Sequence, residues 1–227
     1  MAASAATIRE TLPWSPGEVY PPETARPGPW LFFTAEEAAT VEAVVDRLIP
    51  ADELGPGGKE AGCAIFIDRQ LAGPYGRADG VYMQGPFPEG ALPQQGFQSP
   101  QTPAQAYREG LAALAGHVRQ NMGGRSVAQL PGEELDRLLT ALERGEVKLP
   151  GLGGAAIFDL LFQNTMEGFF GDPIYGGNRD MVGWKLIGFP GTRYDYRDVI
   201  ARPNTRYTLP PVALTGRPEW VVAGGRR

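Results

Sequence analysis

The sequence predicts a mainly α-helical protein: an irregular helical bundle with long ordered loops and extended N- and C-terminal arms. Apolar residues recur at helical spacing in several segments between residues 34 and 187, and no segment shows the alternation of a half-buried strand. The 31 glycines and 22 prolines are concentrated between these segments, where they favour shaped loops. Helices joined by long connections therefore account for the whole pattern.

Three regions follow one another along the chain. Residues 1–30 contain six prolines between Pro13 and Pro29, together with Trp14, Tyr20 and Trp30, which forbids a helix and favours an extended arm. The aromatic side chains indicate that this arm docks onto something. Residues 31–190 form the helical domain, and residues 191–227 are expected to form a second extended arm.

The first helix has the clearest signals at both ends. Thr34 and Glu37 fit a capping box, in which the hydroxyl and the carboxylate each accept a backbone N–H. Pro50 stops the helix. The buried stripe follows the i, i+3, i+4, i+7 spacing and consists of Val41, Val44, Val45 and Leu48.

The same reasoning predicts further helices at about residues 59–71, 104–122, 131–144, 153–170 and 179–187. Pro131 is expected at the first helical position of its helix, where its missing N–H costs nothing. The segment 153–170 is apolar on more than one face, which is typical of the central helix of a bundle.

Residues 73–103 have no sustained period and contain many helix breakers, so we expect a long loop. A loop of this length is either functional or disordered. Disordered segments are poor in aromatic residues. This one contains Tyr75, Tyr82, Met83, Phe87 and Phe97, which favours an ordered loop that lies on a partner.

Composition excludes several function classes. One cysteine, Cys63, cannot form an internal disulfide, a zinc site or an iron–sulfur cluster by itself. The formal charge of −5 disfavours nucleic acid as a partner. No apolar stretch approaches the length of a membrane span. The first residues show no export signal, so we expect a cytoplasmic protein, a removed leader, or export together with a partner.

Each candidate for catalysis is weak. His117 has no neighbouring nucleophile or carboxylate at triad spacing, and Cys63 lies in a small-residue segment typical of an inert buried thiol. The glycines at 151–154 precede a helix and could bind a phosphate, although helix capping explains them as well. The pair Asp195 and Asp198 alternates with arginines, as on a charge-balanced surface arm.

Two stretches resemble a known family. Residues 33–52, with the following segment 62–68, are similar to the opening of the small subunit of gluconate 2-dehydrogenase, also called subunit 3. The run from Phe169 to Asn178, FFGDPIYGGN, with Trp184-Lys185 and residues 187–191, is similar to the most recognisable block of that family. The resemblance covers roughly residues 31–200.

The resemblance implies a non-catalytic small subunit that binds and stabilises a large flavoprotein of the glucose–methanol–choline (GMC) type. That partner would hold FAD and oxidise a sugar, sugar acid or polyol. A cytochrome c subunit with haem c, or an iron–sulfur cluster, could lie elsewhere in the complex. Members of the family often carry a twin-arginine leader that exports the folded complex, which implies a periplasmic location here. No paired arginine precedes residue 31.

Two alternatives remain open at this point. The loop 73–103 could shape the substrate pocket of the partner, or the chain could bind a small ligand by itself near Gly171–Asn178. No catalytic, cofactor-binding or metal-binding residue is expected in this chain. The residues expected to contact the partner are Trp14, Trp30, Tyr82, Phe87, Phe169, Phe170, Asp172, Tyr175, Asn178 and Trp184.

Overall fold

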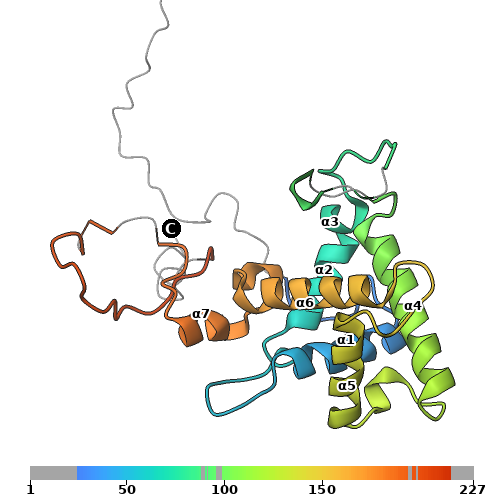
Figure 1. The fold of residues 1–227 in the computed structure, drawn as a ribbon. Coiled ribbons are helices and arrows are strands. Elements are labelled where there is room, and N and C mark those ends of the chain that lie inside the picture. Colours follow the sequence, from blue (N-terminus) through green and yellow to red (C-terminus); the bar gives the residue numbers. More distant parts are fainter. Residues whose placement is uncertain are drawn as a thin grey trace, which may run out of the picture.

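The computed structural model describes residues 25–87, 90, 92–95, 99–193, 196–197 and 199–215. Its helices, shown in Figure 1, are α1 (Ala35–Leu48), α2 (Cys63–Ala72), α3 (Pro74–Arg77), α4 (Pro103–Asn121), α5 (Gly132–Glu143), α6 (Gly154–Phe170) and α7 (Val182–Ile187). Short 3-10 turns occur at Pro93–Gln95, Val127–Gln129, Pro173–Tyr175 and Arg179–Met181. The described residues form no sheet, and the mainly α fold class is confirmed.

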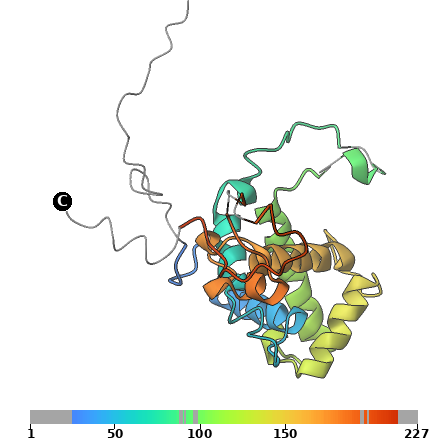
Figure 2. The same ribbon diagram turned by 90° about the vertical axis from the view of Figure 1, so that its left-hand side faces the viewer.

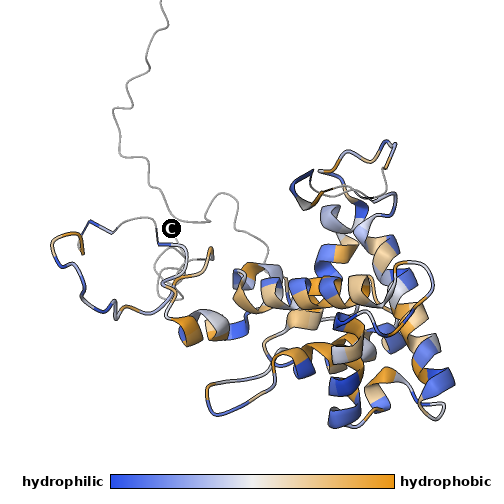
Figure 3. Cartoon of the chain, in the orientation of Figure 1, coloured by the Kyte–Doolittle hydropathy of each residue, from blue (hydrophilic) through white to orange (hydrophobic). Residues whose placement is uncertain are grey.

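Helix α6 is the centre of the bundle, as its apolar composition predicts. It contacts α1, α2, α4, α5 and α7 and runs across the body of the molecule in Figure 1. Figure 3 shows that apolar residues occur along its whole length. Glycines allow two neighbouring helices to approach it closely. Gly110 of α4 lies against Ile157 of α6, and Gly168 of α6 lies against Phe66 of α2. The core therefore lies around α6.

The start of α1 confirms the predicted capping box. The Thr34 hydroxyl accepts the N–H of Glu37 at 3.3 Å, and the Glu37 carboxylate accepts the N–H of Thr34 at 2.8 Å. Glu37 also pairs with Arg108 of α4. Its pKa is lowered although burial opposes the charged form, because the hydrogen bonds from Arg108 and Thr34 outweigh burial.

A buried carboxylate anchors the chain before α1. Asp68 of α2 is fully buried and accepts the backbone N–H groups of Leu31, Phe32 and Phe33 at 2.9, 3.0 and 2.9 Å. Its charge is balanced by the neighbouring Arg69. The described end of the N-terminal arm is thereby fixed against α2.

Three predicted helix boundaries are wrong, each for a local reason. Residues 59–62 form turns, so α2 begins at Cys63, and Gly62 before it has left-handed backbone (φ 86°). Pro131 is the N-cap of α5, with extended backbone (ψ 148°), and helical geometry begins one residue later. The segment 179–187 is divided because Asp180 and Met181 are both left-handed (φ 56° and 57°).

The predicted loop 73–103 is not irregular throughout. Pro74 opens the short helix α3, which packs directly on the end of α2. Beyond α3 the chain projects from the body before it returns to α4, as Figures 1 and 2 show from two directions. The 3-10 turn Pro93–Gln95 lies within this projection.

The described part of the C-terminal arm contains no helix. It forms a wide loop beyond α7 in Figures 1 and 2 and then comes back to the body, where Val212 pairs with Gly191. The division of the chain at residues 30 and 190 stays a prediction.

We expect Leu161→Ala to lower the free energy of unfolding by about 2–5 kcal/mol, because it leaves a cavity at a fully buried site in the middle of α6. Urea denaturation followed by circular dichroism measures this change. The matched control is Leu54→Ala at a site that is 70% exposed, where the change should stay within about 0.5 kcal/mol. Equal effects at both positions would contradict the central role of α6.

Candidate partner-binding surfaces

The first candidate surface is built on residues 169–191, where the chain leaves α6 and turns back through α7. Asp172 is buried at the start of this segment. Its Oδ1 accepts the N–H of Ile174 at 2.9 Å and caps the turn Pro173–Tyr175. Its Oδ2 accepts the N–H of Leu214 at 2.8 Å. One carboxylate therefore joins the end of α6 to the C-terminal arm.

Asn178 connects the end of α6 to the start of α7. It is fully buried and has left-handed backbone (φ 44°, ψ 41°), which asparagine tolerates better than most residues. Its Nδ2 donates to the carbonyl of Gly171 at 2.7 Å, and its Oδ1 accepts the N–H of Gly183 at 2.9 Å. Because an amide provides both a donor and an acceptor, asparagine meets every requirement of this position.

Trp184 fixes α7 to the end of α6. It is buried, and its Nε1 donates to the carbonyl of Phe170 at 2.6 Å. Phe189 packs edge-on against its ring, with the centroids 5.2 Å apart. Two backbone bonds then close the arm over this site, from Thr192 to the Val212 carbonyl and from Val212 to the Pro190 carbonyl, at 2.7 and 3.2 Å.

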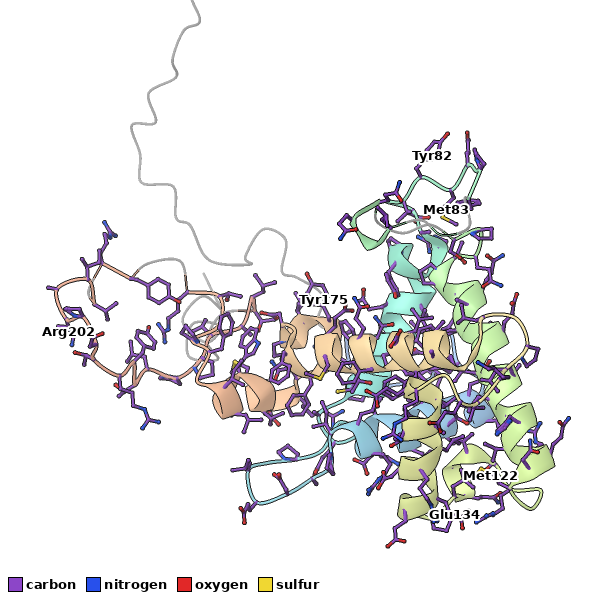
Figure 4. The ribbon with its side chains drawn as sticks, in the orientation of Figure 1. Tyr82, Met83, Met122, Glu134, Tyr175 and Arg202 are labelled. Atoms are coloured by element: carbon purple, nitrogen blue, oxygen red, sulfur yellow. The ribbon has the colours of Figure 1, made fainter. Side chains whose placement is uncertain are left out.

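Five exposed apolar side chains lie on this segment and on the arm bound to it, and we call them the α7 surface. Its members are between 44% and 59% exposed and are Tyr175, Leu186, Ile187, Phe189 and Leu214. Figure 4 shows Tyr175 pointing outward at the end of α6. A contiguous patch of such side chains would mark an interaction surface, so these five residues are candidates for partner contact.

The second candidate is a groove between α3, α4 and α6. It encloses a cavity of about 670 Å³. A second hollow of about 680 Å³ adjoins it along the projecting loop and shares Gly80 and Val81 with it. The first cavity is lined mainly by apolar groups, and its residues are Pro74, Tyr75, Ala78, Gly80, Val81, Ser99, Gln101, Pro103, Ala106, Leu152, Ala156, Asp159, Leu160 and Gln163.

A buried hydrogen-bond network lies behind one wall of the groove. Asn164 Oδ1 accepts the hydroxyls of Tyr107 and Tyr75 at 2.8 and 3.3 Å, and Asn164 Nδ2 donates to Glu167 at 2.9 Å. Burial raises the pKa of both tyrosines, and the Glu167 carboxylate raises that of Tyr75 further. Both hydroxyls therefore remain protonated at neutral pH and fix the wall in place.

The residues considered for catalysis lie apart from one another. Cys63 is fully buried in α2, and burial raises the pKa of its thiol to about 12. His117 on α4 contacts the side chain of Asn121. Among the described residues, no group of three histidine, cysteine or acidic side chains could hold a metal ion. Within the same residues, no helix has both the length and the apolar character that a membrane span requires.

The predicted contact residues separate into exposed and buried groups. Tyr82 and Tyr175 are 78% and 48% exposed, and Tyr82 lies on the projecting loop in Figure 4. Trp30, Phe87 and Phe170 are half-buried. Trp14 lies outside the described residues. Contact with a partner through any of them stays a prediction.

The other predicted residues have buried side chains that bond within the chain. Asp172, Asn178 and Trp184 make the hydrogen bonds given above, and Phe169 packs against Phe170 with their centroids 5.1 Å apart. Their visible role is internal: they hold the turn from α6 to α7. They shape the α7 surface without lying on it.

Sequence reasoning missed most residues of both surfaces. A signal existed for the α7 surface, because a six-residue helix with the sequence VGWKLI cannot bury all of its apolar side chains. The groove has no local signal. Its walls come from residues 74–81, 99–106 and 152–163, which are brought together only by the fold.

We expect Asn178→Ala to lower the free energy of unfolding by about 1–3 kcal/mol, because it removes the partner of the buried Gly183 N–H and of the partly buried Gly171 carbonyl. Thermal and urea denaturation measure the loss. Asn204→Ala is the matched control, since Asn204 is also left-handed (φ 60°) but exposed. A similar loss in both variants would show that backbone strain, and not the two hydrogen bonds, explains the effect.

Comparison with known proteins adds one finding. The family model described as gluconate 2-dehydrogenase subunit 3 matches residues 35–191, which include the whole bundle and the turn from α6 to α7. No curated protein and no solved structure matches the chain. The family model covers well over half of the chain, and the protein therefore belongs to the gluconate 2-dehydrogenase subunit 3 family.

Proposed function

We propose that this chain is a non-catalytic small subunit that binds and stabilises a large FAD-dependent dehydrogenase of the GMC type, acting on a sugar, sugar acid or polyol. Membership of a family named for a subunit carries the proposal. The exposed apolar α7 surface supports it, because burial of such side chains against a partner would stabilise the complex.

In this proposal the cofactors belong to the other subunits. FAD lies in the large subunit, and haem c or an iron–sulfur cluster in a further subunit accepts the electrons. The glycines before α6, the best phosphate candidate in this chain, have structural roles. Gly154 allows close packing, because a Cβ there would meet the Val147 carbonyl and the Leu142 side chain, and Gly153 caps α6 with positive φ (88°).

The proposed complex is periplasmic and crosses the membrane in folded form, with a cytoplasmic complex as the alternative. The only support is that members of this family often carry a twin-arginine leader. Fractionation of cells that express the natural gene decides between the two compartments.

The projecting loop favours a second candidate function, in which the small subunit shapes the substrate pocket of its partner. Tyr82 is 78% exposed, and Val81 beside it is 44% exposed. A stand-alone ligand-binding protein is a further alternative. The cavity of about 670 Å³ that supports it lies between α3, α4 and α6, and not at Gly171–Asn178, where the sequence suggested such a site.

We expect the chain, co-expressed with a GMC-type flavoprotein of the same genome, to co-purify with that flavoprotein and to raise its melting temperature, because a bound subunit stabilises the folded state. Ile187→Asp should weaken the association, with Leu54→Asp as the matched control on an exposed loop. Flavin absorbance or dye-linked sugar oxidation by the isolated chain would contradict the proposal.

The second candidate function predicts that Tyr82→Ala combined with Phe87→Ala raises KM for the sugar roughly threefold or more in an intact complex, because substrate contacts are lost. Steady-state kinetics with a dye acceptor measures this. Leu54→Ala should leave KM unchanged. Unchanged kinetics in the double variant would remove the loop from the substrate pocket and leave the binding role in place.

A further inference from the structure

We propose that the groove beside α3 is the docking site for an apolar segment of the large flavoprotein subunit that carries a lysine or arginine next to its apolar side chains. This inference rests on the proposed function and adds the chemistry of the contact.

The shape of the groove favours a polypeptide segment. The two hollows share Gly80 and Val81, so together they extend from Leu152 and Ala156 at the body to Tyr82 and Phe87 on the projecting loop. An extended or helical segment can follow such a path. A compact small molecule would occupy only one of the hollows, whose volumes are about 670 and 680 Å³.

The near wall is held in place by contacts within the chain. Helix α3 packs on α2 and α4, and the turn after it is closed by N–H bonds from Asp79 to Pro74 and from Val81 to Ala78, at 3.0 and 2.9 Å. Tyr75 is bound to Asn164 behind this wall. A preformed wall loses little conformational entropy when a partner binds.

Apolar groups dominate the floor of the first hollow. Ala156 and Leu160 of α6, Ala106 of α4 and Val81 all face it. Val81 is 44% exposed, and Leu92 on the same loop is 63% exposed. Covering these side chains with the aliphatic or aromatic side chains of a partner would remove apolar surface from water.

One acidic residue, Asp159, lines the groove, and further carboxylates lie beside its rim. Two of these carboxylates bind lining amides: Gln101 donates to Glu109 at 2.5 Å, and Gln163 donates to Glu167 at 3.2 Å. The residues that line either hollow include no lysine or arginine. A basic side chain in the occupant would complement this rim. A second copy of this chain, with its net charge of −5, is a poorer match.

The test is the Kd of the purified chain for the immobilised GMC-type flavoprotein that co-purifies with it, measured by biolayer interferometry. We expect Val81→Asp and Ala156→Trp each to weaken binding about tenfold or more, since one places a charge in the groove and the other fills it. Asp159→Lys should weaken binding roughly three- to tenfold and reduce the salt dependence of Kd.

Matched controls lie away from the groove. Leu54→Asp in the loop between α1 and α2 parallels Val81→Asp, and Glu143→Lys at the end of α5 parallels Asp159→Lys. Both control positions are exposed, and α5 lies at the opposite end of the body from α3 in Figures 1 and 2. The controls should bind as the wild type does. Circular dichroism confirms that each variant is folded, and if one unfolds, the other two decide.

Two results would overturn the inference while leaving the proposed function intact. One is wild-type affinity in Val81→Asp and Ala156→Trp. The other is an apolar small molecule, found by native mass spectrometry in the wild-type chain and lost from Ala156→Trp at unchanged Kd. If the wild-type chain does not bind the flavoprotein at all, the proposed function fails, and the docking site fails with it.

Discussion

The burial of α6 is the constraint on which the rest of the structure depends. An apolar helix surrounded by α1, α2, α4, α5 and α7 fixes where each of them can lie. Both candidate surfaces are built on this helix. Ala156, Asp159 and Gln163 in its first three turns face the groove, and Phe170 at its end accepts the indole bond of Trp184. The two surfaces are therefore held in a constant spatial relation by one rigid element.

The extended segments are attached to this bundle by buried carboxylates. Asp68 accepts three consecutive backbone N–H groups before α1, and Asp172 accepts one from its own turn and one from Leu214. Arms without helices or sheets have N–H groups that need acceptors when they are buried. A carboxylate supplies two oxygens at one point and makes strong hydrogen bonds. A buried carboxylate therefore holds an extended segment before α1 and another after α7.

Local signals were sufficient to predict α1, α4 and α6, because caps and apolar spacing are properties of neighbouring residues. They failed where tertiary contacts decide. The left-handed Asp180 and Met181 break a segment that propensity alone makes helical, and the bonds of Asn178 across that turn favour the break. The buried roles of Phe169 and Trp184 were equally invisible, since an aromatic residue suits an interface and a core alike. The groove, assembled from three distant segments, could be found only in the fold.

Several exposed apolar residues would be more stable if a partner covered them. Ile187, Ile200 and Tyr82 are 59%, 73% and 78% exposed, on a short helix, on the arm and on the projecting loop. Fully burying one such side chain is worth about 1.5–3 kcal/mol, so a partner that covers several would favour the complex, with part of the gain offset by the cost of association. The bundle supplies its own core, whereas Ile200 and Leu209 on the arm and Val81 and Leu92 on the projecting loop are between 44% and 73% exposed. In the proposed complex, the bundle would thus be a rigid support, and the segments that project from it would gain most from the partner.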